Sequence, residues 1–108
     1  MELEGKKVVI PVEDMFNTHE FWYPYYRLKE AGCEVVVMGS GSAETYTGKP
    51  GTEVTVDVNA DQVSASEFDG IVIPGGYAPD KMRRYPKMLQ LVRDLHEAGK
   101  VVAAICHA

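Results

Sequence analysis

The chain has 108 residues, 45% of them hydrophobic and 25% charged, which is the composition of one globular domain with a modest core. Its formal net charge of −5 argues against nucleic-acid binding, which requires clustered lysine and arginine. No apolar run approaches the roughly 20 residues of a membrane span, and the N-terminus lacks the apolar core of a signal peptide. We therefore expect a cytoplasmic protein without membrane contact, in which both cysteines are reduced.

The first third of the chain predicts a strand, a helix and a second strand. Residues 6–12 form an apolar run of strand length. Asn17 or Thr18 is expected to cap a helix that ends at Gly32, and Pro24 within it predicts a kink. Residues 33–38 are again apolar and predict the second strand.

The rest of the chain continues the alternation. Valines at 54, 56 and 58 alternate with polar residues and predict one half-buried strand, with residues 46–47 as its hairpin partner. Residues 64–67 have the pattern of a capping box for one helical turn. A buried strand at 69–74, a helix that starts at Pro86 and ends before Gly99, and a last strand at 100–105 complete the chain.

Strands that alternate with helices of crossover length predict an α/β fold with a parallel sheet. The valine-rich strands agree, because strands of a parallel sheet are apolar on both faces. Neither an internal repeat nor a linker divides the sequence, so we expect a single domain.

Residues with chemical potential follow three of these strands. Glu20 comes after the first, Gly75 and Gly76 after the strand at 69–74, and Cys106 after the last. Because ligands bind beyond the carboxyl ends of parallel strands, we expect a carboxyl, two backbone amides and a thiol at one sheet edge. Cys33 begins a strand and is expected at the opposite edge, too far from Cys106 for a disulfide.

The last five residues, AICHA, have the spacing small-x-nucleophile-x-small. A sharp strand-to-helix turn requires small residues two positions on either side, and it exposes the middle side chain. We therefore interpret Cys106 as a nucleophile rather than an inert core thiol.

Other interpretations of the polar residues stay open. A surface position for His107 competes closely with its role as a base. An ordinary carboxylate at the positive end of a helix dipole is a serious alternative for Glu20. A zinc site made of Cys106, His107, Glu20 and His19 lacks a repeated ligand spacing, so we expect neither a metal nor a cofactor.

Four stretches of the sequence resemble the ThiJ/PfpI family, within the class I glutamine amidotransferase-like superfamily, and in particular its PfpI-like intracellular cysteine protease branch. They are YPYYRLKEAG, TGKPG, FDGIVIPGGYAPD and VVAAICHA, in the family's order and spacing. The resemblance implies a flavodoxin-like α/β three-layer sandwich that forms homo-oligomers, either dimers or hexamers. It also implies further elements after Ala108. We therefore expect residues 1–108 to be the N-terminal portion of one domain, ending at the nucleophile elbow and inactive alone.

The resemblance also implies roles for individual residues. Cys106 falls on the family's nucleophile, and His107 falls on the adjacent histidine that serves as the base. Glu20 falls on the acid that hydrogen-bonds to the nucleophilic sulfur. Gly75 and Gly76 fall on the loop whose backbone amides form the oxyanion hole.

Three positions depart from the family's pattern. Asp80 stands where PfpI-like proteins carry a glutamate that reaches the histidine of a neighbouring subunit, and its side chain is one methylene shorter. Asn17 stands where these proteins have a second acidic residue. Ala108 stands where the family most often has glycine.

Three functions follow from the resemblance. The first is a cysteine-nucleophile hydrolase of the intracellular peptidase type, which uses Cys106 with His107 and Glu20. The second is a glyoxalase or protein deglycase that acts on methylglyoxal or its adducts. The third is a non-enzymatic redox sensor or chaperone, in which Cys106 oxidises to a sulfinate held by Glu20.

Overall fold

A five-stranded parallel sheet forms the centre of the molecule. The computed structural model describes residues 2–108. The strand order is β5-β2-β1-β6-β7, and every neighbouring pair is parallel. The bounds are Lys7–Val12 for β1, Glu34–Gly39 for β2, Val58–Asn59 for β5, Gly70–Ile73 for β6 and Val101–Ala104 for β7. The prediction of an α/β fold with a parallel sheet is therefore confirmed.

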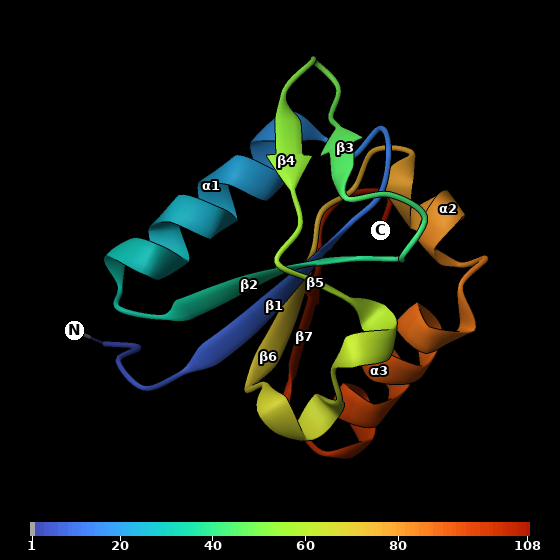
Figure 1. Ribbon diagram of the computed structural model, residues 1–108. Helices are drawn as coiled ribbons and strands as arrows, with labels where there is room; N and C mark the ends of the chain where they lie inside the picture. Colours follow the sequence, from blue (N-terminus) through green and yellow to red (C-terminus); the bar gives the residue numbers. More distant parts are fainter. Residues whose placement is uncertain (1) are drawn as a thin grey trace.

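Helices cover the two faces of this sheet (Figure 1). Helix α1 (Thr18–Glu30) lies on one face, and α3 (Pro86–Glu97) lies on the other with two single 3-10 turns, η1 (Ala60–Gln62) and η2 (Ala65–Glu67). The chain crosses from β1 to β2 in one direction and from β6 to β7 in the other. Since such crossovers are right-handed, their helices must lie on opposite faces. The result is the expected flavodoxin-like three-layer sandwich.

The reversal of direction occurs between β1 and β6, which are neighbours in the sheet. Connections that leave these two strands at their carboxyl ends diverge to opposite faces, which leaves a crevice between them. The segments that follow β1, β6 and β7 all leave the sheet at this carboxyl edge. The topology thus places the candidate residues at the position where parallel sheets bind ligands.

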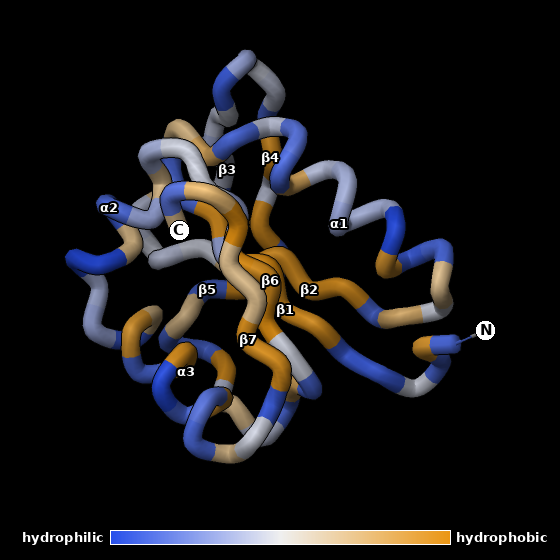
Figure 2. The backbone as a smooth tube through the Cα atoms, turned by 180° about the vertical axis from the view of Figure 1, so that it is seen from behind, coloured by the Kyte–Doolittle hydropathy of each residue, from blue (hydrophilic) through white to orange (hydrophobic). Residues whose placement is uncertain are grey.

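The core is built from the apolar strands and the side chains that α1 and α3 turn toward them. Figure 2 shows β1, β2 and β7 as hydrophobic segments through the middle of the molecule, with more hydrophilic helices around them. The largest fully buried side chains are Tyr46, Phe16, Phe21, Phe68, Ile10 and Met38. Strand β7 lies at the sheet edge, and Val101 there is 67% exposed.

The start of α1 is set by Asn17. Its side-chain Oδ1 accepts hydrogen bonds from the backbone N–H groups of His19, at 3.0 Å, and Glu20, at 3.1 Å. This N-cap satisfies two of the amides that lack an intrahelical partner at a helix start. Asn17 rather than Thr18 is therefore the cap, and α1 continues through Pro24 to Glu30.

The prediction of one strand across Val54, Val56 and Val58 is wrong. Residues Glu53–Thr55 form β4 in an antiparallel hairpin with β3 (Thr45–Thr47), whereas β5 joins the main sheet beside β2. The chain passes from the hairpin to the main sheet at Asp57. The Asp57 N–H donates to the Val37 carbonyl and its Oδ2 accepts from the Val37 N–H, each at 2.8 Å. A short helix, α2 (Ala78–Met82), follows β6 and was not expected.

Candidate active site at the carboxyl edge of the sheet

Cys106 lies in a tight turn directly after β7. The N–H of Ile105 still donates to the Ile73 carbonyl, at 3.0 Å, so the strand pairing reaches the residue before the cysteine. Cys106 then has a φ of +56°, and the Ala108 N–H closes the turn onto the Ile105 carbonyl at 3.2 Å. A non-glycine residue in this left-handed region costs about 1 kcal/mol, and such strain concentrates at functional sites. The Cys106 side chain is exposed, as a nucleophile needs to be.

Glu20 and Gly75 meet beside this turn. The Gly75 N–H donates to Glu20 Oε1 at 2.7 Å, which joins the first turn of α1 to the loop after β6. A Cβ atom added to Gly75 would lie 2.6 Å from the Ile105 carbonyl oxygen and 3.1 Å from the His107 nitrogen. The backbone around Cys106 therefore packs directly on Gly75, and three loops distant in sequence converge at one place.

Gly76 fixes the same loop to the segment after β1. Its φ is +86°, and a Cβ atom there would lie 2.6 Å from the Met15 carbonyl oxygen and 2.7 Å from the Asn17 nitrogen. On either side of it, the Asn17 N–H donates to the Gly75 carbonyl and the Tyr77 N–H donates to the Met15 carbonyl, both at 3.0 Å. Only glycine fits this approach of two backbones.

The geometry bears on the predicted oxyanion hole. The Gly75 N–H is already bonded to Glu20, so it can serve an oxyanion only if the carboxyl releases it. Within residues 2–108, no hydrogen bond is recorded for the N–H groups of Gly76 and His107. The amide of His107 follows the nucleophile directly, which is where acyl-transfer enzymes with a nucleophile elbow place one oxyanion donor.

His107 and Asp80 are not paired with each other in the described chain. The His107 side chain is exposed, whereas Asp80 Oδ1 accepts from Arg83 Nη1 at 2.7 Å, one turn further along the chain. Both partners of that pair are about half exposed, so it contributes little to stability. Asp80 would have to leave Arg83 in order to orient a histidine, and its role across a subunit interface stays a prediction.

Asn17 contributes through structure rather than through acid–base chemistry. Its side-chain oxygen caps α1 and its N–H holds Gly75, so both groups are engaged. The sequence reasoning missed Glu13, a carboxylate that is only 4% exposed at the end of β1. A charged residue directly after a buried strand was the signal that could have identified it.

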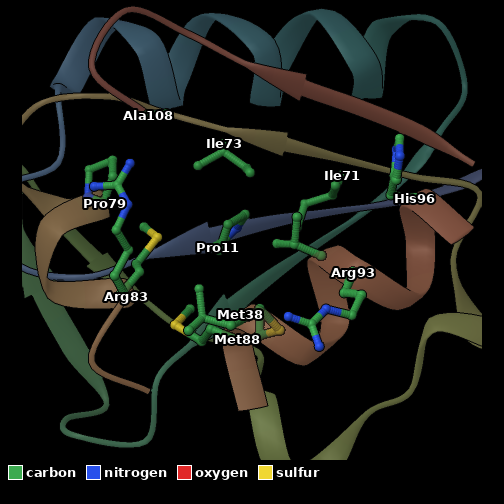
Figure 3. A pocket seen from close by; sticks show the side chains of 13 residues that line it. Pro11, Met38, Ile71, Ile73, Pro79, Arg83, Met88, Arg93, His96 and Ala108 are labelled. Atoms are coloured by element: carbon green, nitrogen blue, oxygen red, sulfur yellow. The ribbon is translucent and has the colours of Figure 1, made fainter. Parts of the chain in front are cut away.

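A hollow of about 480 Å³ lies on the α3 side of the sheet, away from these groups (Figure 3). Apolar side chains such as Met38, Met88 and Ile71 line it, with Arg83 and Arg93 also in its wall. Ala108 reaches it, but neither Cys106 nor Glu20 does. Because it contains no nucleophile, we place the candidate active site at the loops described above and not in this hollow.

The described residues contain neither a cluster of metal ligands nor a helix that could span a membrane. Nowhere between residues 2 and 108 do three histidine, cysteine, aspartate or glutamate side chains gather as metal ligands would. In the same part of the chain, no helix has the length and apolar character needed to cross a membrane.

The two thiols are expected to differ sharply in reactivity. Cys33 is buried, and burial raises the pKa of its thiol, so that it stays protonated at neutral pH. Cys106 is exposed. Iodoacetamide should therefore label the native protein once, at Cys106, and reach Cys33 only after unfolding, as peptide mass spectrometry can show. A Cys33→Ser variant should take up the same single label. Equal labelling of both cysteines in the native protein would contradict this assignment.

Comparisons with known proteins identify relatives of this chain. The family model described as "DJ-1/PfpI family" matches residues 6–108. Deglycase PH1704 of Pyrococcus horikoshii is 44% identical over 101 residues, which cover 94% of this chain and 60% of that protein. YraA of Bacillus subtilis, whose name places it provisionally among cysteine proteases, is 36% identical over 95% of this chain and 61% of its own length.

A solved structure gives the same result for the fold. The crystal structure of a two-domain protein from Anabaena variabilis, with DJ-1/ThiJ/PfpI-like and ferritin-like domains, superposes with a TM-score of 0.91. The two sequences are 50% identical, and the match covers 94% of this chain and 31% of the Anabaena chain. The chain spans about 60% of the length of the curated relatives that it matches.

Proposed function

The chain belongs to the DJ-1/PfpI family, and from that premise we propose that the protein is a cysteine-nucleophile enzyme of the deglycase type, with Cys106 as the nucleophile. The observation that carries the proposal is the left-handed backbone conformation of Cys106. It holds an exposed thiol in the left-handed region, at the tip of the edge strand β7 and against the Glu20–Gly75 pair. The name of the relative PH1704 supports deglycase chemistry as the first candidate.

The chemical step proposed for Cys106 is addition to a carbonyl carbon. The thiolate forms the C–S bond while the carbonyl π electrons move onto oxygen, and the free amides of His107 and Gly76 are suited to stabilise that oxyanion. For a methylglyoxal adduct of an amine, the amine leaves with a proton, and proton transfers convert the remaining hemithioacetal into a lactoyl thioester. One water then breaks the C–S bond, which releases lactate and restores the thiol. The balance needs neither an oxidant nor a reductant, so side chains alone can supply the proton transfers.

Glu20 is the first proposed proton carrier for the thiol. Its Oε1 accepts from Gly75, which leaves Oε2 to carry a proton toward the sulfur or the substrate oxygen. A protonated carboxyl that donates to the thiolate would favour the charged form of the sulfur, whereas an ionised one would oppose it. His107 is the second candidate. Since adjacent residues on a helix do not face one another, it needs a partner to orient it toward the cysteine.

A peptidase is the second candidate function, and the name of the relative YraA favours it. The same addition step would then occur at a peptide carbonyl, and the departing group would be the amine of the cleaved bond. The geometry of the nucleophile is common to both reactions, so the substrate must be identified by assay.

The test is a paired assay of the complete protein. We expect release of lactate and free amine from methylglyoxal-treated Nα-acetyl-lysine, and no cleavage of fluorescent casein. Cleavage of casein without lactate release would replace the deglycase by the peptidase. Turnover of neither substrate, together with a selective gain of two oxygens at Cys106 after mild peroxide, would support the redox sensor instead.

A further inference from the structure

A buried carboxylate lies outside the candidate site, at the base of one of its loops. Glu13 follows β1 directly and is only 4% exposed. A buried charge is costly unless hydrogen bonds replace the lost water. Glu13 has three such partners: the Ser40 hydroxyl and the Ser42 hydroxyl, the latter at 2.9 Å, donate to Oε2, and the Asp14 N–H donates to Oε1 at 3.1 Å. The carboxylate is therefore held as part of a satisfied polar cluster.

Tyr46 extends this cluster to the β3–β4 hairpin. Its hydroxyl lies 2.9 Å from Ser42 Oγ and 3.2 Å from Ser40 Oγ, and it accepts from the Ala43 N–H at 3.0 Å. The ring is 1% exposed and packs on Gly39, where an added Cβ would lie 3.0 Å from Tyr46 Cε2. Glu13, Ser40, Ser42 and Tyr46, which we call the Glu13 cluster, thus join the end of β1, the loop after β2 and the hairpin.

The segment that starts at Glu13 is the one that carries the candidate site. Met15 donates its N–H to the Thr47 carbonyl at 2.8 Å and accepts from the Tyr77 N–H at 3.0 Å. Asn17 then bonds Gly75 and begins α1, which presents Glu20. Residues 13–17 are consequently held at one end by the Glu13 cluster, in the middle by bonds to Thr47 and Lys49, and at the other end by the Gly75–Gly76 loop.

We propose that Glu13 is a positioning residue for the Cys106 site, an inference that rests on the proposed function. The carboxylate has no recorded contact with Cys106 or Gly75 within residues 2–108, so it acts through the segment 13–17. Removing the acceptor that the Ser40 and Ser42 hydroxyls share frees this segment at its base. Glu20 then loses its fixed placement against Gly75, and the carboxyl is no longer held beside the nucleophile.

The experiment compares three variants of the complete protein. Glu13→Ala removes the acceptor, Glu13→Gln keeps the length and one carbonyl oxygen, and Thr45→Val removes only an exposed hairpin hydrogen bond, from Thr45 to Thr55. We expect Glu13→Ala to lower kcat about tenfold with KM changed less than about twofold, because orientation and not binding is lost. Glu13→Gln should recover at least about half of kcat, and Thr45→Val should match the unaltered protein.

A readout independent of substrate separates the two proposals. In the proposed mechanism a protonated Glu20 donates to the thiolate, so its displacement in Glu13→Ala should slow alkylation of Cys106 by iodoacetamide about threefold. If the unaltered protein turns over no substrate, the deglycase proposal fails, while the alkylation rates still decide the role of Glu13. If turnover occurs and Glu13→Ala leaves kcat and the alkylation rate unchanged, Glu13 is not a positioning residue, although the enzyme proposal stands.

Two controls guard against a simple loss of stability. If Thr45→Val loses as much activity as Glu13→Ala, the effect is general and the positioning role is overturned. If Glu13→Ala does not fold, Ser42→Ala replaces it, since that change removes one hydroxyl from an exposed residue. A fall in kcat of about twofold, accompanied by slower alkylation, would then support the proposal, and unchanged values of both would refute it.

Discussion

Replacement of Cys106 by alanine should lower kcat by at least about a thousandfold, because it removes the thiolate that is proposed to form the covalent bond to the carbonyl carbon. Cys106→Ser should be almost as inactive, since a serine hydroxyl stays protonated at neutral pH without a strong base. Lactate release from the methylglyoxal adduct measures both variants. The exposed position of the side chain means that the fold should survive the change. Activity in Cys106→Ala within about tenfold of the unaltered protein would exclude this residue as the nucleophile.

A second prediction at Cys106 concerns stability: a substitution that abolishes activity should raise the free energy of unfolding relative to the alanine variant. Cys106 has a φ of +56°, which costs a residue with a Cβ atom about 1 kcal/mol and costs glycine nothing. Cys106→Gly should therefore be as inactive as Cys106→Ala, yet its free energy of unfolding should be about 1 kcal/mol higher than that of the alanine variant. Urea denaturation of both variants tests this. Equal stabilities would show that the turn relaxes and stores no strain.

Gly75→Ala is expected to damage both activity and stability. The new Cβ would lie 2.5 Å from Glu20 Oε1, 2.6 Å from the Ile105 carbonyl oxygen and 3.1 Å from the His107 nitrogen. Two of these atoms belong to the backbone and cannot rotate away, so the turn that holds Cys106 must shift. We expect kcat to fall about a hundredfold, and the free energy of unfolding to fall by about 1–3 kcal/mol.

Gly51→Ala is the matched control for this change. Nothing lies within 4 Å of a Cβ placed at Gly51, and its φ is not positive. The control should therefore keep full activity and unfold at the same or a slightly higher denaturant concentration. If Gly75→Ala keeps more than about half of the activity, close packing of the Cys106 turn on Gly75 is not needed for catalysis.

Elements whose pattern is local were predictable from the sequence. Strands β1, β2, β6 and β7 and helices α1 and α3 lie where expected. Their burial follows from the hydrophobic pattern of residues that are close in sequence. Their alternation was enough to predict parallel pairing. The strand at 54–58 was not predictable in the same way. Alternation determines which face of a strand is buried, but the hydrogen bonds between Asp57 and Val37 decide where the chain changes sheets.

The same distinction between local pattern and long-range packing applies to the candidate site. The sequence by itself determined that Glu20, Gly75 and Cys106 follow strands of one parallel sheet, because chain order and strand direction place them at one edge. Only the tertiary structure decided how their groups pair. It assigns the Gly75 N–H to the Glu20 carboxyl, the Asn17 side chain to the cap of α1, and Asp80 to Arg83. The Glu20–Gly75 pairing joins segments 55 residues apart, which local patterns do not encode, whereas the Asn17 cap and the Asp80–Arg83 pair are local. The buried Glu13 cluster is the clearest case, because its carboxylate and hydroxyls are neighbours only after the sheet and hairpin have packed.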